Sequence, residues 1–139
     1  MPLTLTIDRN DPDYLYVLVR ASDENASIAT YIYVGQLNLE AVLPGLERFR
    51  TDVHGGLFDL KFGVFGQEYA GGALHVHLHF QTLGVINMTI RVQSEFVPFG
   101  KQDVASEATL YTQTSVAQLD NFARAMQAIS DGFCDEAQL

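Results

Sequence analysis

The sequence predicts one α+β domain, in which a single antiparallel sheet of about seven strands carries two helices packed on one of its faces. Two observations support this fold class. Several segments alternate apolar and polar residues with the period of two that is typical of strands, and two others repeat apolar residues with helical spacing. Their order along the chain is βββ-α-ββββ-α. The 139 residues contain no sequence repeat and no Pro/Ser-rich linker, so we expect a single domain over 1–139.

The first three strands form the N-terminal third of the chain. Apolar rows run over 3–7, 15–19 and 28–34. The turn cluster Asn10–Asp13 and the polar loop Asp23–Asn25 separate these rows, which is typical of a meander. Four tyrosines lie on the opposite face of the second and third strands: Tyr14, Tyr16, Tyr31 and Tyr33.

The first helix follows these strands. Apolar residues from Leu39 to Phe49 have helical spacing, and Asn38 fits the N-cap position. Pro44 leaves two alternatives, because a proline inside a helix costs about 3 kcal/mol. Either the helix kinks at Pro44, or the main helix begins there with Pro44 in its first turn. The segment 54–56, His-Gly-Gly, is expected to end it.

Four more strands are expected in the second half of the chain. The alternating segments cover 58–62, 76–80, 86–92 and roughly 104–112. Turns are expected at Gly66 and the Gly71-Gly72 pair, around Leu83, and at 97–100.

The second helix closes the predicted fold. Ser115 and Gln118 have the form of a capping box, and Gly132 fits the position just after the helix. The residues between them carry one apolar stripe. We expect the acidic segment 131–139 to be a flexible tail.

The stretch LHVHLHF, residues 74–80, holds three of the four histidines. Residues two apart share one face of a strand, so the three histidines lie together, opposite the core row. Folding the neighbouring segments as hairpins predicts which side chains flank them across the sheet. The expected neighbours are Lys61 and Arg91 for His75, Asp59 and Thr89 for His77, and Asn87 for His79.

This histidine strand suggests a metal site. Residues i and i+2 of a strand are about 6.6–6.8 Å apart and residues i and i+4 about 13 Å, so two adjacent histidines can share one ion but three cannot. The candidate ligands for zinc are His75, His77 and Asp59, with a water completing the site. Two alternatives stay open: an ordinary solvated sheet face, which neighbouring cations favour, and a pH-sensitive histidine surface. The place of His54 stays open too.

Charge narrows the class of partner. The formal net charge is −9, from 17 acidic and 8 basic residues, which disfavours nucleic-acid binding and favours a basic protein partner. The sequence has no run of 18 apolar residues, so we expect no membrane span. The N-terminus does not look like a secretory signal, and the single cysteine, Cys134, fits a reducing cytoplasm. We therefore expect a cytoplasmic location.

The motifs favour binding over catalysis. The sequence has no phosphate-binding glycine loop and no G-x-S-x-G elbow, and acidic neighbours disfavour a Cys134 thiolate. We expect a non-enzymatic protein-binding domain without a cofactor; the alternative is a zinc-binding protein or metal-dependent hydrolase that uses 75–79. An exposed row of aromatic side chains is typical of a protein interface. Cross-strand packing would explain the tyrosines equally well. A further alternative is a homodimer that forms through the outer sheet face or an edge strand. The candidate partner-binding residues are Tyr14, Tyr16, Tyr31, Tyr33 and His79.

Two stretches resemble a known group of proteins. GGALHVHLHFQTLGVINMTIRV reads as a glycine-marked hairpin, and LYTQTSVAQLDNFARAM reads as a polar turn followed by a helix with Leu119, Phe122 and Met126 on one side. Over roughly 28–130 this pattern resembles the WapI-type immunity proteins, small bacterial domains that neutralise contact-dependent toxins. The resemblance implies that the chain binds and neutralises a toxin without catalysis. The acidic charge agrees with a basic toxin.

Overall fold

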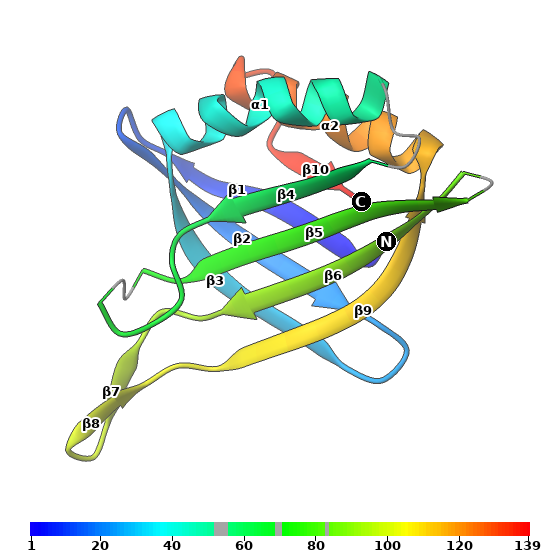
Figure 1. Ribbon diagram of the computed structural model, residues 1–139. Helices are drawn as coiled ribbons and strands as arrows, with labels where there is room; N and C mark the ends of the chain where they lie inside the picture. Colours follow the sequence, from blue (N-terminus) through cyan, green and yellow to red (C-terminus); the bar gives the residue numbers. More distant parts are fainter. Residues whose placement is uncertain (52–55, 69–70, 83) are drawn as a thin grey trace.

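The computed structural model describes residues 1–51, 56–68, 71–82 and 84–139. Over these residues the chain forms strands and two helices in the following order (Figure 1). The elements are β1 (Leu3–Asn10), β2 (Tyr14–Ser22), β3 (Ser27–Gly35), α1 (Gln36–Thr51), β4 (Leu57–Phe62), β5 (Ala73–Thr82), β6 (Val85–Gln93), β7 (Val97–Phe99), β8 (Gln102–Val104), β9 (Glu107–Ser115), α2 (Val116–Ser130) and β10 (Glu136–Gln138).

The α+β class and the antiparallel pairing are confirmed, but the prediction of a single sheet is wrong. The strands form a sheet A in the order β10-β1-β2-β3, a sheet B in the order β4-β5-β6-β9, and a separate hairpin, β7-β8. Figure 1 shows sheet A behind sheet B. Alternation tells which side chains face the core, but it does not tell whether a strand after a helix rejoins the first sheet or starts another.

The helices were expected on one face of one sheet, and the structure places them differently. They lie side by side above the space between the two sheets, where β4 and β10 are the nearest strands (Figure 1). One apolar cluster joins the inner rows of both sheets to the inner sides of both helices. The core is therefore a three-sided space, bounded by two sheets and a helical pair.

The predicted ends of the second helix are confirmed, and the predicted start of the first helix is wrong. Ser115 caps α2, since its Oγ accepts a hydrogen bond from the Gln118 amide at 3.2 Å, and Gly132 has φ 82° just beyond the helix. Pro44 lies inside α1, so the helix does not begin there. Asn38 is not its N-cap, because α1 starts at Gln36, directly after the last residue of β3. Of the predicted stop at 54–56, His54 and Gly55 lie outside the described residues.

Two boundaries near the C-terminal half differ from expectation. The strand predicted over roughly 104–112 is β9, which runs from Glu107 to Ser115 and leads into α2 without a loop. The segment 97–100, expected as a simple turn, belongs to the β7–β8 hairpin. The turn expected around Leu83 falls on a residue outside the described part of the chain.

The C-terminal segment is more than a tail. Glu136–Gln138 forms β10, which pairs with β1 along the edge of sheet A. Ala137 is buried, and Leu139 is fully buried, with its backbone N–H donating to the Leu3 carbonyl oxygen at 2.9 Å. The expectation of a flexible tail over 131–139 is therefore wrong for the paired strand Glu136–Gln138, which the acidic composition did not indicate.

The topology contains a repeat that the sequence does not show. The unit β1-β2-β3-α1-β4 has the same order as β5-β6-β9-α2-β10, and in each unit the helix follows the third strand without a loop. The last strand of each unit pairs with the first strand of the other: β4 with β5, and β10 with β1. Each half therefore completes the sheet of the other half.

Three pairs of equivalent positions in the two helices are buried alike. Counted from the first helical residue, Leu39 corresponds to Leu119, Leu46 to Met126 and Phe49 to Ile129, and all six are buried. Only Leu39 and Leu119 keep the same residue type. Burial pattern, and not residue identity, is what the two halves share.

One insertion breaks this repeat. The first half joins β2 to β3 by a short turn, in which Asp23 Oδ1 accepts hydrogen bonds from the amides of Asn25 and Ala26. The second half places the β7–β8 hairpin between the corresponding strands, and Figure 1 shows this hairpin extending away from both sheets. Val97 and Phe99, on one side of it, are 54% and 67% exposed.

The close approach of the two halves at Gly72 gives a first prediction. A Cβ on Gly72, which has φ +89°, would lie 2.7 Å from Ile32 Cγ2 and 3.2 Å from the Gln93 carbonyl oxygen. We expect Gly72→Ala to lower the free energy of unfolding by about 2–4 kcal/mol, through left-handed strain and overpacking together. Gly100→Ala, at φ +65° with nothing within 4 Å of the added carbon, should lose only about 1–2 kcal/mol in urea unfolding. Equal losses for the two variants would mean that Gly72 does not set the spacing of the sheets.

The burial of the C-terminal residue gives a second prediction. Leu139→Ala should lower the free energy of unfolding by about 2–5 kcal/mol, because it leaves a cavity beside β1. The matched control is Leu37→Ala on α1, where the side chain is 78% exposed. Its effect in the same unfolding experiment should stay within about 0.5 kcal/mol. Equal free energies of unfolding for the two variants would contradict the burial of Leu139.

Candidate functional site

The histidine face lies on the outer side of sheet B. Its predicted cross-strand neighbours are confirmed by the register of β4, β5 and β6. Asp59, His77, Thr89 and Tyr111 form one continuous row across the four strands of the sheet. The other confirmed pairs are His75 with Lys61 and Arg91, and His79 with Asn87.

Two of the three candidate zinc ligands meet in this row. His77 Nδ1 lies 2.6 Å from Asp59 Oδ1, in a hydrogen bond between two partly exposed side chains. His75 points elsewhere: its Nε2 lies 3.1 Å from the Gly63 carbonyl oxygen, and its ring packs edge-on against Phe65. Within the described ranges, no three His, Cys, Asp or Glu side chains come together as a group that could hold a metal ion. Zinc binding by His75, His77 and Asp59 thus stays a prediction, and His54 lies outside the described residues.

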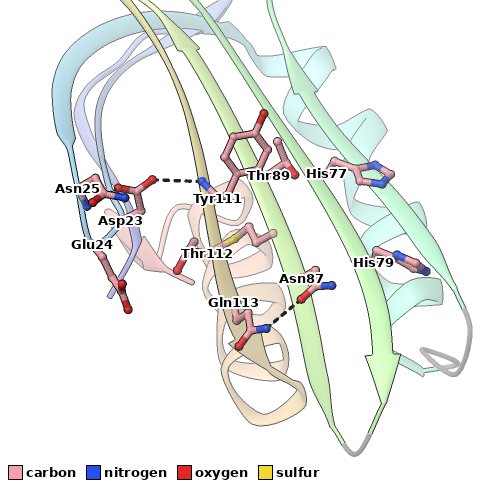
Figure 2. A pocket seen from close by; sticks show the side chains of 11 residues that line it. Asp23, Glu24, Asn25, His77, His79, Asn87, Thr89, Tyr111, Thr112 and Gln113 are labelled. Atoms are coloured by element: carbon pink, nitrogen blue, oxygen red, sulfur yellow. Dashed lines mark hydrogen bonds between the residues drawn. The ribbon is translucent and has the colours of Figure 1, made fainter.

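A polar hollow of about 720 Å³ opens on the same face (Figure 2). One wall is the β2–β3 turn, which lies against the free edge of β9 because Asp23 Oδ2 accepts a hydrogen bond from the Tyr111 amide at 3.3 Å. Hydrogen bonds from the Asn25 and Ala26 amides lower the pKa of Asp23, burial opposes them more weakly, and the hydrogen bond from the Tyr111 amide adds a still smaller lowering effect. The Asp23 carboxylate therefore stays charged and fixes this wall.

The floor of the hollow carries a row of side-chain amides. Gln113 Nε2 donates to Asn87 Oδ1 at 3.1 Å, and Asn87 Nδ2 donates in turn to Gln81. Figure 2 shows the Tyr111 ring standing above this floor, with His77 and His79 on the neighbouring strand. Sequence reasoning missed Tyr111 and Asp23 as site residues, because their contact joins segments 88 residues apart.

The four predicted tyrosines lie together on the outer side of sheet A. The Tyr16 ring stacks on Tyr31 with centroids 4.7 Å apart, and it lies 4.7 Å from Tyr33, which meets Tyr14 edge-on at 5.3 Å. The Arg9 guanidinium lies 5.0 Å from the centre of the Tyr16 ring. We call Tyr14, Tyr16, Tyr31, Tyr33 and Arg9 the tyrosine face. The fifth predicted partner residue, His79, is not part of it, because it belongs to sheet B.

Equivalent positions on the two outer faces differ in chemistry. Tyr33 and Gln113 both stand three residues before the first residue of their helix, and their strand partners are Tyr16 and Asn87. In the same way Tyr31 and its partner Leu18 correspond to Tyr111 and Thr89. Sheet B carries amides where sheet A carries Tyr16 and Tyr33, but it keeps a tyrosine at the position of Tyr31 and has Val85 at the position of Tyr14. The shared topology therefore does not require tyrosines at positions 16 and 33.

Tyr16 has a perturbed acidity, which gives a third prediction. Burial raises its pKa above the ordinary value of 10.0, the Glu95 carboxylate and Tyr33 add to this effect, and Arg9 opposes it. Above that ordinary value the unfolded chain loses the Tyr16 proton before the folded chain does, so folding stability should fall as pH rises. Between about pH 9 and 11, the free energy of unfolding in urea should fall less for Tyr16→Phe than for the parent. A variant whose stability falls as steeply as that of the parent would contradict this assignment.

In the part of the chain that the structure describes, neither helix has the length and apolar character needed to cross a bilayer. Comparison with protein-family models, with curated proteins and with solved structures gives no match to this chain. The similarity to WapI-type immunity proteins therefore stays a prediction.

Proposed function

We propose that this chain is a non-enzymatic protein-binding domain and that the tyrosine face is its contact surface. The proposal rests on one observation: four tyrosines form a contiguous outer surface on sheet A, and the positions on sheet B that correspond to Tyr16 and Tyr33 carry the amides Asn87 and Gln113. Because both sheets share one topology, the fold itself does not require tyrosines at positions 16 and 33. Tyrosine and arginine are enriched at the energetic centres of protein interfaces, which supports a binding role.

The charges around the tyrosine face favour a basic partner. Asp11 and Asp13 lie in the turn that precedes Tyr14, and Asp8 lies where the register of β1 shifts beside Arg9. Glu136 on β10 pairs with Thr6 and extends the acidic border to the far edge of the sheet. With a net charge of −9, this border would attract a basic protein and speed its association.

The proposed biological role is that of an immunity-type protein. A basic toxin that is active inside the cell is the kind of partner that an acidic aromatic surface suits, and the proposed location is the cytoplasm. Inhibition by contact would need no catalytic group on this chain. A second copy of the chain is the competing occupant of the same surface.

The test is affinity capture from the source cell with matched variants. The parent should retain a protein of basic isoelectric point, and the double variant Tyr16→Ser with Tyr33→Ser should weaken that complex by at least about tenfold, or 1.4 kcal/mol. The control carries Asn87→Ser and Gln113→Ser, the equivalent positions on sheet B, and should bind like the parent. Quantitative mass spectrometry of the captured proteins measures all three.

Each other outcome of this capture experiment is informative. Equal retention by the two double variants would refute the tyrosine face as the contact surface. Recovery of the chain itself, with a parent that sediments as a dimer and a Tyr16/Tyr33 variant that sediments as a monomer, would replace the toxin partner by a homodimer. Partner binding that does not weaken as salt is raised would contradict the role of the acidic border.

A further inference from the structure

The hollow on sheet B has the size of a small-molecule site and no role in the proposed protein interface. Its volume of about 720 Å³ falls within the range of ligand pockets, which is about 300–1,000 Å³. It lies on the opposite sheet from the tyrosine face, between the β2–β3 turn and strands β5, β6 and β9 (Figure 2). A ligand here would be independent of a protein on sheet A.

The polar groups of the hollow are held in fixed orientations by their neighbours. Asp59 engages His77 Nδ1, which leaves the Nε2 atom of that ring for another partner. Gln113 and Asn87 are locked together through one donor and one acceptor. Among the described residues, the Gln113 Oε1 and Thr89 Oγ1 atoms have no hydrogen-bond partner. The floor therefore presents oriented neutral donors and acceptors on adjacent strands.

Among the described residues that line the hollow, Tyr111 is the only Phe, Tyr or Trp. Its side chain is 71% exposed, although its backbone is fixed at the edge of β9 by Asp23. Thr89 is its strand partner, so the ring lies beside a hydroxyl and the amide row. An exposed ring surrounded by hydrogen-bonding groups can pack against a flat apolar surface whose edges are polar.

The chemistry of the walls restricts the class of ligand. Asp23, held charged by three amide donors, and Glu24 disfavour anions. An apolar molecule would leave the amides and the imidazole unpaired, which costs binding energy. A neutral molecule with many hydroxyl groups and one apolar C–H face would satisfy both the amide row and the Tyr111 ring.

We propose that this hollow binds a neutral pyranose sugar. Tyr111 packs against the C–H face of the ring. Gln113, Asn87, Thr89 and His77 Nε2 exchange hydrogen bonds with its hydroxyl groups, for which amides and hydroxyls offer both donors and acceptors.

The test is an NMR titration of the 139-residue chain with the methyl glycosides of glucose, galactose, mannose and N-acetylglucosamine. At least one glycoside should bind with a dissociation constant of about 1 mM and shift the amide signals of residues 87, 89, 111 and 113. Tyr111→Ala should weaken this binding by at least about tenfold, and Tyr111→Phe, which keeps the ring, should retain it. The matched control is Tyr31→Ala, at the equivalent position on sheet A.

Three results would overturn the sugar site. One is the absence of a saturable shift in these amides with any of the four glycosides at about ten times the expected dissociation constant. Another is equal weakening by Tyr111→Ala and Tyr31→Ala, which would place the sugar elsewhere. The third is a parent-like titration of Tyr111→Ala. Melting temperatures of the variants within about 2 °C of the parent establish that they are folded.

Discussion

The exchange of edge strands between the two halves is the constraint on which this fold depends. β4 leaves the first half to pair with β5, and β10 leaves the second half to pair with β1. The loop-free junctions at Gly35-Gln36 and Ser115-Val116 make this exchange work, because each sends a helix from one sheet toward the other. Two sheets and two helices then enclose one apolar cluster, and neither half has a complete sheet of its own.

Local patterns predicted local structure well and failed where the chain changes layers. The period-two rows gave the inner faces of the strands, and the parity of those rows gave the neighbours of all three histidines on β5. Ser115 and Gly132 marked the ends of α2, because capping and left-handed backbone are properties of a few adjacent residues. The sequence did not predict the division into two sheets. The alternation of apolar and polar residues does not tell which strands pair when a helix lies between them in the sequence.

The candidate sites also combine features that local sequence patterns predict with features that they do not. The four tyrosines came from two adjacent strands of a meander, so the sequence could place them together, and the structure stacks their rings. The zinc hypothesis rested on three residues that share a face, yet facing the same side does not fix side-chain direction. The Phe65 ring and the Gly63 carbonyl, both from the β4–β5 connection, hold His75 away from its neighbours. The hollow at Tyr111 needed a contact with Asp23, far away in sequence, which no local pattern contains.

Strand exchange also has a consequence for biosynthesis. A chain that emerges from the ribosome N-terminus first can form the hairpins of β1, β2 and β3 early, but β1 stays an open edge until residues 136–138 have been made. An unpaired edge strand is a template for pairing with other chains. The acidic residue Asp8 borders that edge, and its charge discourages two nascent chains from joining there. Sheet A, the first sheet begun, is therefore closed only after residues 136–138 have been made.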